Sequence, residues 1–366
     1  MTDENKEPGR KRLRRRNSDR LRVEDVAAAA GVSGATVSRV INRTGSVSDG
    51  IRQRIEETIE ALGYVPNGAA RALASNKTHA IGIVIPTLEN SNFAITAEAA
   101  QRRLRSASFQ TLIASSDYDP QQEWEQIQSL VAHGVDGIIL VGAQRQNSVA
   151  DFLKARHVPF VVTWSLADKE TPSVGFDNAE AARKLAKHLL DLGHRQIGVI
   201  AGLTRNNDRA AARLEGIRRA FSDRNLAVPR ELLIEKPYRI AEGQFALRAL
   251  MAMSPPPTAV ICGNDQLAFG ALIECGRQNI PVPEQLSIAG FDDLEFASQI
   301  VPALTTVHVP AEEIGRRAAE YLLARIAGEA WQHTTEVMVS LVVRDSTAPP
   351  PSNPGHLNDS RLENAL

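Results

Sequence analysis

Polar residues between positions 33 and 42 have the chemistry to bind nucleic acid. Hydroxyl, amide and guanidinium groups bond phosphate oxygens and the edges of bases in the major groove of DNA. Helical spacing places five such residues on the outward face of one short helix: Ser33, Thr36, Ser38, Arg39 and Asn42. An ordinary helical hairpin with a polar outer face is the alternative, because such hairpins are common.

Two short helices joined by a tight turn are needed to present this face. The first runs from Val23 to Ala30 with apolar residues at helical spacing, and Gly31 ends it. Ser33 is placed to cap the second helix. The apolar side of that helix consists of Val37, Val40 and Ile41. This pattern is typical of a helix-turn-helix, which lays its second helix in the major groove.

Three segments of the helix pair match a known pattern: Asp25-Val26-Ala27, Ala30-Gly31-Val32-Ser33 and Thr36-Val37-Ser38-Arg39-Val40-Ile41-Asn42. They resemble the headpiece of the LacI/GalR family of bacterial transcription regulators. The resemblance implies that double-stranded operator DNA is a partner. It also adds Gly34 and Ala35 to the expected DNA contacts, because the family most often reads bases from these two positions.

Gly34 and Ala35 depart from the family because neither has a hydrogen-bonding side chain. At most, Ala35 offers a methyl contact to thymine. We therefore expect specificity to depend on Arg39, Thr36 and Ser33, together with the shape of the groove.

The starts of the first and third helices carry different signals. The family usually has Ser or Thr before the first helix, and this chain has Arg22 there, so the cap must come from another residue. Ser48 is placed to cap the third helix, which has apolar residues on one side as far as Leu62.

Residues 67–78 resemble the hinge helix and linker of the family. The resemblance implies DNA contacts from Asn67 and Ala70, and a wedge from Leu73 into the minor groove at the centre of a palindromic operator. The segment is too short to be a stable helix alone, so we expect it to order when it pairs with a second subunit on DNA. A homodimer follows from this expectation.

The charge is uneven along the chain. Residues 1–76 hold fourteen Lys and Arg against ten Asp and Glu, although the net charge of the whole chain is -1. A basic block near the N-terminus lacks apolar residues, which predicts a disordered segment that attracts phosphates non-specifically. We expect a basic tail (1–20), a DNA-binding domain (21–66), a hinge helix and linker (67–78), an effector-binding and dimerisation domain (79–347) and a disordered C-terminal tail (348–366).

Short apolar runs alternate with helical patterns after His79, which predicts parallel sheets with crossover helices. The runs lie at 81–86, 111–115, 137–142, 159–164, 173–176, 196–202, 232–235, 258–262, 286–290 and 304–309. The segment Ile81–Pro86 is echoed by Ile197–Gly202, so two similar halves would face each other across a cleft. The predicted fold class is an all-α helix-turn-helix headpiece plus a two-lobed α/β domain with parallel sheets.

The family resemblance extends over residues 22–347. Its marks are Val174-Gly175-Phe176-Asp177-Asn178, Leu192-Gly193-His194-Arg195-Gln196-Ile197, Arg213-Leu214-Glu215-Gly216, Cys262-Gly263-Asn264-Asp265 and Pro302-Ala303-Leu304-Thr305-Thr306-Val307. It implies a periplasmic-binding-protein-like effector domain. In such a domain the chain would cross between the lobes near Asp177, Thr305 and Met338.

The resemblance also implies which side chains contact a small-molecule effector. Arg213 matches an arginine that bonds polar groups of the effector, and Asp265 matches an acid that accepts hydrogen bonds from it. Core packing is the alternative for Phe93 and Trp164, and a helix cap is the alternative for Asp265. The expected effector contacts are Phe93, Trp164, Arg209, Arg213, Tyr238, Asn264 and Asp265.

The effector is expected to be an anion. Arg205, Arg209 and Arg213 are spaced by four near a predicted helix N-terminus, a place that suits carboxylates and phosphates. Residues 174–183 resemble gluconate-responsive repressors, which favours a sugar acid such as gluconate or ketogluconate that releases the operator. The alternatives are a purine or neutral sugar acting as corepressor, and arginines at 205 and 209 that are merely solvated.

An enzyme and a sugar-binding transport receptor are the competing classes. The sequence has no GxGxxG, GxxxxGK[ST], GxSxG or HExxH motif, and its histidines show no metal-ligand spacing, so we expect no catalysis, metal or cofactor. Asp292 and Asp293 are expected in a turn after a strand. The chain has two cysteines and no apolar run of membrane-spanning length, and its N-terminus lacks a secretion signal. It is therefore predicted to be cytoplasmic and to have no membrane contact.

Overall fold

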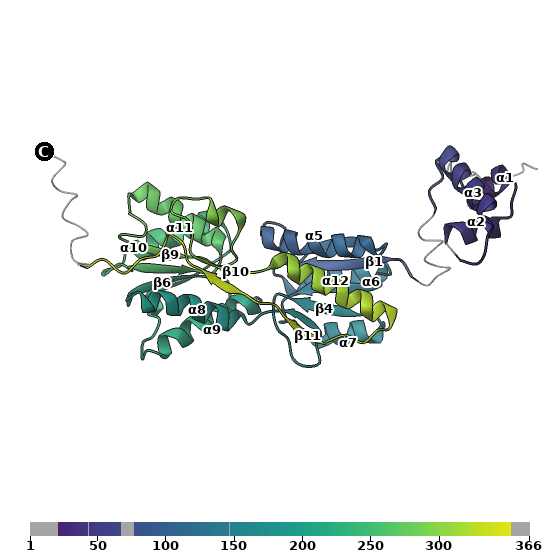
Figure 1. Cartoon of the computed structure of the whole chain (residues 1–366). Helices are drawn as coiled ribbons and strands as arrows, with labels where there is room; N and C mark the ends of the chain where they lie inside the picture. The colour runs from purple at the N-terminus through teal and green to yellow at the C-terminus, as the bar shows by residue number, and fades with distance from the viewer. Residues whose placement is uncertain (1–20, 43, 67–76, 146, 353–366) are drawn as a thin grey trace, which may run out of the picture. The chain divides into compact units, whose positions relative to one another are not determined.

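The computed structural model describes residues 21–42, 44–66, 77–145 and 147–352 (Figure 1). The chain forms two compact units that divide between Thr78 and His79. Among the described residues, no helix is both long enough and apolar enough to cross a membrane.

The first unit contains three helices around a small apolar core. Helix α1 spans Val23–Ala30, α2 spans Gly34–Ile41 and α3 spans Asp49–Leu62. The core residues are Val26, Ala27, Ala30, Val37, Val40, Ile55 and Tyr64. The predicted helix-turn-helix, followed by a third helix, is therefore confirmed.

The helix ends follow local hydrogen-bonding rules. Gly31 ends α1 in the left-handed region, with φ 67°. The missing cap before α1 comes from Asp25, whose carboxylate accepts a hydrogen bond of 2.7 Å from the backbone N–H of Arg22. Ser33 caps α2 as predicted, since its Oγ accepts from the N–H of Thr36 at 3.2 Å. Ser48 precedes α3, but its side chain makes no capping hydrogen bond, so the prediction for this residue was wrong.

The first lobe of the second unit has a six-stranded parallel sheet in the order β11-β5-β4-β3-β1-β2. Its strands are β1 Ala80–Ile85, β2 Gln110–Ser115, β3 Gly137–Val141, β4 Phe160–Thr163, β5 Ser173–Gly175 and β11 Thr334–Glu336. Alternate side chains of β1 point to opposite faces. Helices α5 (Ser91–Ser106) and α12 (Ala311–Ala327) cover one face, and α6 (Pro120–Ala132) and α7 (Asn147–Ala155) cover the other.

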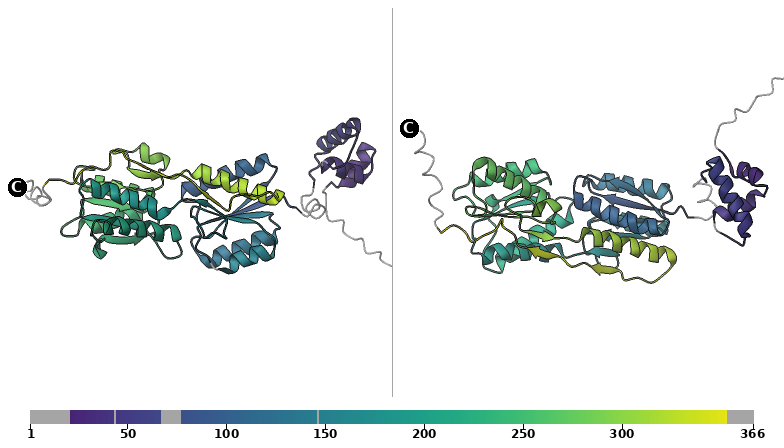
Figure 2. Two further views of the ribbon diagram at one scale, coloured as in Figure 1. Left: turned by 60° about the horizontal axis from the view of Figure 1, so that its bottom comes forward. Right: turned by 45° about the horizontal axis from the view of Figure 1, so that its top comes forward.

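The second lobe repeats this plan with four parallel strands in the order β7-β6-β8-β9. These strands are β6 Ile197–Gly202, β7 Leu233–Lys236, β8 Ala259–Cys262 and β9 Ser287–Ala289. Helices α8 (Asn178–Asp191) and α9 (Asp208–Ser222) lie on one face, and α10 (Ile240–Met251) and α11 (Asp265–Gln278) lie on the other. The shorter helices η1 (Arg230–Leu232) and η2 (Glu295–Ser298) complete the lobe. Figure 2 shows these layers from two further directions.

The chain passes between the lobes three times, as predicted. It leaves the first sheet after β5 and enters α8, returns through β10 (Thr306–His308) to α12, and leaves again through β12 (Ser340–Val342). Strands β10 and β12 pair antiparallel, with Thr306 opposite Val342. The predicted fold class is confirmed, because both parallel sheets and their crossover helices are present.

One apolar core continues from lobe to lobe. It includes residues of β1, α5 and α12 as well as residues of α8 and α9. Three aromatic rings connect these parts: Phe176 lies 6.4 Å from Trp164 and 6.2 Å from Phe291, between ring centroids. The lobes therefore share packing behind the cleft, where the chain crosses.

Two parts of the chain were not anticipated. The short strands β11 and β12 do not appear among the predicted apolar runs. The residues of β11 are polar, whereas β12 lies in a largely apolar stretch, 337–343, that was overlooked. Order also continues beyond the predicted start of the C-terminal tail at residue 348. The carbonyl oxygen of Ala348 lies 2.8 Å from Nε2 of His194, and the N–H of Ala348 donates to Oγ of Ser287 at 3.0 Å. The basic tail (1–20) and residues 353–366 lie outside the described residues.

Helices α8 and α9 approach so closely that their contact tests the packing of the second lobe. A Cβ added to Gly216 of α9 would lie 1.9 Å from the carbonyl oxygen of Ala179 in α8. Gly216→Ala should therefore lower the free energy of unfolding by about 1–3 kcal/mol, because the helices must move apart. Urea unfolding followed by circular dichroism measures this change.

Gly276 of α11 is the matched control, because no atom lies within 4 Å of its added Cβ. Gly276→Ala should leave stability unchanged or raise it by up to about 1 kcal/mol, since Ala favours a helix. A Gly216→Ala protein as stable as Gly276→Ala would contradict the described helix contact.

Candidate functional site

The outward face of α2 presents the residues expected to contact DNA. Ser33, Ala35 and Arg39 are exposed, while Gly34, Thr36, Ser38 and Asn42 are partly exposed. The buried side of the same helix consists of Val37 and Val40, which pack on α1 and α3. The helix core therefore holds the polar face toward solvent.

Several polar groups on this face are already ordered by one another. The hydroxyls of Ser33 and Thr36 lie 2.9 Å apart, and Nδ2 of Asn42 donates to Oγ of Ser38 at 3.2 Å. Arg39 is the one long cationic side chain of α2. The other expected DNA contacts, Asn67, Ala70 and Leu73, lie outside the described residues.

A pocket lies between the lobes of the second unit. The first lobe contributes Asn90, Phe93, Tyr118 and Trp164, and the second contributes Asn207, Arg209, Arg213, Tyr238, Asn264 and Asp292. These residues lie near the carboxyl ends of the strands or at the starts of the following helices, where ligands bind in open α/β sheets. A pocket with few charges and several aromatic rings suits a small organic molecule.

Six of the seven expected effector contacts line this pocket: Phe93, Trp164, Arg209, Arg213, Tyr238 and Asn264. Four lining residues were not expected: Asn90, Tyr118, Asn207 and Asp292. Asn90 and Asn207 precede helices, where an Asn side chain also serves as a cap. Tyr118 follows β2, and a polar loop after a strand is the signal that would have indicated it.

Asp265 was expected to contact the effector, but it does not line the pocket. It is fully buried, and its two carboxylate oxygens accept hydrogen bonds from the Thr306 hydroxyl at 2.6 Å and the Leu294 N–H at 2.8 Å. Burial raises the pKa of this carboxyl to about 7. The pocket acid is instead Asp292, in the turn that follows β9.

Arg213 and Asp292 form the charged centre of the pocket. The Arg213 guanidinium lies 3.7 Å from the Phe291 ring centroid and donates to Asn178 Oδ1 at 3.0 Å and to the Gly263 carbonyl at 2.9 Å. Its remaining nitrogen lies 3.4 Å from Oδ1 of Asp292. Burial raises the pKa of Asp292 to about 6, although the positive charge of Arg213 acts to lower it.

Arg209 adds a second buried cation, one helical turn before Arg213. Its guanidinium lies 2.8 Å from the carboxylate of Asp208, which accepts hydrogen bonds from the N–H of Ala143 and the hydroxyl of Ser165, both at 2.7 Å. Because Ala143 and Ser165 belong to the first lobe, Asp208 ties the lobes together beside the pocket. Arg205 is exposed and precedes α9, which begins at Asp208, so the expected helical row of three arginines is not formed.

Two hydrogen-bond donors in the pocket wall have no partner among the described residues. Nε1 of Trp164 and Nδ2 of Asn264 are both buried and unpaired. A buried donor without a partner costs about 1–3 kcal/mol. Both groups line the pocket, so a ligand with oxygen acceptors would satisfy them.

Two family models match parts of the chain. Residues 22–67 match the bacterial regulatory proteins of the lacI family, and residues 186–347 match a periplasmic binding protein-like domain. The first match covers the helix-turn-helix, and the second covers α9 to α12 with the pocket side chains that they carry.

Curated proteins and solved structures share this organisation over most of the chain. The transcriptional regulator GntR of Pseudomonas aeruginosa is 36% identical over 91% of this chain and 97% of its own length. The transcriptional repressor PurR of Mannheimia succiniciproducens is 32% identical over 88% of this chain and 98% of its own. A crystal structure of the lac repressor dimer, bound to operator and an anti-inducer, is 28% identical with a TM-score of 0.80, covering 90% of this chain and 99% of its own.

Two buried asparagines of the pocket region provide a matched test of the unpaired donors. Asn264 uses only Oδ1, which caps α11 by accepting from the N–H of Leu267 at 3.0 Å. Asn178 uses both ends, because it also donates to the Trp164 carbonyl at 2.8 Å. Serine retains a capping oxygen and removes the amide.

Asn264→Ser should therefore lower the free energy of unfolding by less than about 1 kcal/mol, and Asn178→Ser by about 2–4 kcal/mol, because the latter loses two satisfied hydrogen bonds. Urea unfolding of the ligand-free protein measures both. Equal losses in the two variants would show that the Asn264 amide has a partner in solution.

Proposed function

Because this chain belongs to the LacI family and is a DNA-binding transcription regulator rather than an enzyme, we propose that it represses transcription from a pseudo-palindromic operator. A small sugar acid such as gluconate or ketogluconate fills the pocket between the lobes and releases the operator. The observation that carries this proposal is the donor-rich wall of that pocket, in which the guanidinium groups of Arg209 and Arg213 are joined by two unpaired donors, Nε1 of Trp164 and Nδ2 of Asn264.

The pocket favours an anion over a neutral sugar. Arg209 and Arg213 are both buried, with 6% and 7% of their surface exposed, and they pair with Asp208 and Asp292. An anionic ligand would compete with these carboxylates for the guanidinium donors. The unpaired Nε1 of Trp164 and Nδ2 of Asn264 add two neutral donors. A carboxylate accepts several hydrogen bonds and suits this arrangement.

The remaining pocket groups suit the hydroxylated part of a sugar acid. Asp292 accepts hydrogen bonds, while Asn90 and Asn207 can donate and accept. The aromatic rings of Phe93 and Tyr238 offer apolar faces for the C–H groups of a sugar chain. The relative named GntR in Pseudomonas aeruginosa supports the same ligand class.

A purine corepressor is the second candidate. The relative named PurR, 32% identical over most of both chains, supports it, and the aromatic side chains of the pocket suit a flat ring. The two candidate ligands also have opposite effects on operator binding. A ligand that prefers the DNA-binding arrangement of the lobes strengthens operator binding, and one that prefers another arrangement weakens it.

The proposed regulator acts as a homodimer, since two symmetric headpieces match two half-sites of a palindrome. An apolar ridge on the second lobe supports self-association. Phe296 is 57% exposed and packs on Phe269 with ring centroids 5.2 Å apart, and Ile273 is exposed one helical turn further along α11. The lac repressor dimer, as its structure describes it, gives the same assembly for a relative.

Calorimetry tests the ligand class. Gluconate, 2-ketogluconate, glucose and hypoxanthine are each titrated into the protein. We expect the two acids to give heat with the wild type and no heat with Arg213→Ala.

Gluconate should bind at least about threefold more tightly at pH 5 than at pH 8, because protonation of Asp292 below its pKa of about 6 removes a charge that repels the anion.

Asp292→Asn should reduce this pH dependence, leaving the part that comes from Asp265, while Asp191→Asn, on the surface of α8, should retain it in full. Tight binding of glucose or hypoxanthine with no heat from either acid would refute the sugar-acid proposal. Hypoxanthine binding that strengthens operator binding would favour the purine corepressor instead.

Arg39 tests the assignment of the recognition helix. Arg39→Ala should reduce discrimination between a selected operator and random DNA by about 1–3 kcal/mol, the worth of one specific base contact. Fluorescence anisotropy at fixed salt measures both affinities.

Arg54→Ala is the matched control, because Arg54 is an exposed arginine on α3. It should change both affinities alike, as should removal of residues 1–20. An unchanged ratio of operator to random affinity in Arg39→Ala would count against α2 as the reading helix.

A further inference from the structure

The turn after β9 touches three parts of the second unit at once. Asp292 lines the pocket, and its carbonyl accepts from Nδ2 of Asn92 in the first lobe at 3.3 Å. Its N–H donates to the carbonyl of Val307 in β10 at 2.9 Å. The turn therefore contacts the pocket, the opposite lobe and a crossover strand.

This turn has an unusual backbone that its neighbours hold in place. Asp292 and Asp293 have φ values of 121° and 54°, and residues other than glycine rarely adopt positive φ values. The carboxylate of Asp265 accepts from the N–H of Leu294 and from the hydroxyl of Thr306. Asp265 thus anchors the turn and β10 to the start of α11, which explains why this acid is not in the pocket.

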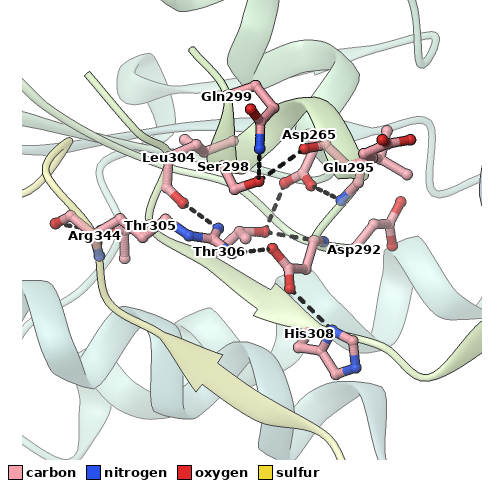
Figure 3. Close-up of polar contacts among 12 residues, drawn as sticks. Asp265, Asp292, Glu295, Ser298, Gln299, Leu304, Thr305, Thr306, His308 and Arg344 are labelled. Carbon is pink, nitrogen blue, oxygen red and sulfur yellow. Dashed lines mark hydrogen bonds and ion pairs between the residues drawn. The ribbon is translucent and has the colours of Figure 1, made fainter. Parts of the chain in front are cut away.

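Asp293 uses its carboxylate on the crossover segments rather than on the pocket. Its Oδ2 lies 2.9 Å from Nδ1 of His308, the last residue of β10, and its Oδ1 accepts from Arg344 at 2.7 Å. Arg344 follows β12 and also donates to the carbonyl of Leu304 at 2.8 Å. Figure 3 labels His308, at the end of β10, and Arg344, which follows β12, among the polar contacts of this region.

The carboxylates of the two neighbouring acids therefore have different partners. Asp292 faces the pocket and Arg213, and Asp293 bridges the two segments through which the chain passes between the lobes. Any shift of Asp292 must move the next residue, since only one peptide unit separates them. A change in the arrangement of the lobes would act on β10 and β12, because both strands lie on the segments that connect the lobes.

We propose that Asp293 is the positioning residue that couples ligand binding to the lobe arrangement, by carrying displacement of the pocket acid into the bridge with His308 and Arg344. The inference rests on the proposed function, since it requires a ligand that controls DNA binding. It assigns that control to one carboxylate outside the pocket. Coupling between ligand binding and DNA binding requires a structural element with more than one arrangement, whose equilibrium both binding events shift.

A comparison of Asp293→Asn with Asp191→Asn isolates this role. Asp191 also bridges two cations, Lys187 and Arg224, but on the exposed face of α8. For each protein, calorimetry gives the gluconate Kd, and anisotropy gives the operator Kd with and without saturating gluconate. If gluconate gives no heat with the wild type, hypoxanthine replaces it in the same measurements.

Asp293→Asn should reduce the ligand-induced change in operator Kd at least fivefold, and should change the ligand Kd less than threefold. Asp191→Asn should match the wild type in both. Arg344→Lys, which retains the charge, should keep more coupling than Arg344→Met. This split between affinity and coupling separates a positioning role from a merely structural one.

Wild-type coupling in Asp293→Asn would overturn the inference and leave the proposed function intact. A parallel loss of ligand affinity and coupling would also overturn it, because Asp293 would then act in the pocket. If Asp293→Asn is unstable, the comparison of Arg344→Lys with Arg344→Met decides, and equal coupling in these two proteins would refute the bridge.

Absence of heat from both ligands with the wild type would instead refute the proposed function. In that case an unchanged operator Kd of ligand-free Asp293→Asn would refute the inference, and a shift of at least fivefold that Asp191→Asn does not share would support it.

Discussion

A buried guanidinium organises the second unit. Burying a charge is costly unless hydrogen bonds and a counter-charge replace water. Arg213 meets this requirement with four groups from three places: Asn178 at the start of α8, the Gly263 carbonyl after β8, and the Phe291 ring and Asp292 carboxylate after β9. The positions of these elements are therefore tied to a single side chain on α9, and the cleft is built around it.

The same constraint makes the cleft responsive. Arg213 and Asp292 balance each other in the described structure, whereas Trp164 Nε1 and Asn264 Nδ2 are left unpaired. Under the proposed function, an arriving ligand group would satisfy these donors and compete for the guanidinium. Redistribution of the Arg213 hydrogen bonds would change the free energy with which the surrounding elements hold their present arrangement. A ligand can shift an equilibrium between two arrangements only if it changes their free energies by different amounts.

Sequence patterns predicted the helices and both sheets, because apolar periodicity is a local feature, and the family resemblance implied six of the ten residues that line the pocket. They failed where the outcome depends on three-dimensional detail. Asp265 and Asp292 both follow strands at the same sheet edge, but the Asp265 carboxylate is taken up by the Thr306 hydroxyl and the Leu294 N–H, and Asp292 lines the pocket. Arg205 was misplaced because Asn207 caps α9 two residues later in the chain. The strand β11 carries no apolar signal, whereas β12 lies in an apolar stretch, 337–343, that was overlooked.

The return of α12 to the first lobe has a consequence for synthesis on the ribosome. Gly315 of α12 lies so close to α5 that a Cβ there would be 2.0 Å from the Thr96 carbonyl, and the Thr96 hydroxyl donates to Ala311. This helix is translated after every strand of the second sheet. The nascent first lobe must therefore expose the apolar side of α5 until translation is nearly finished, which makes it a target for chaperones and for aggregation.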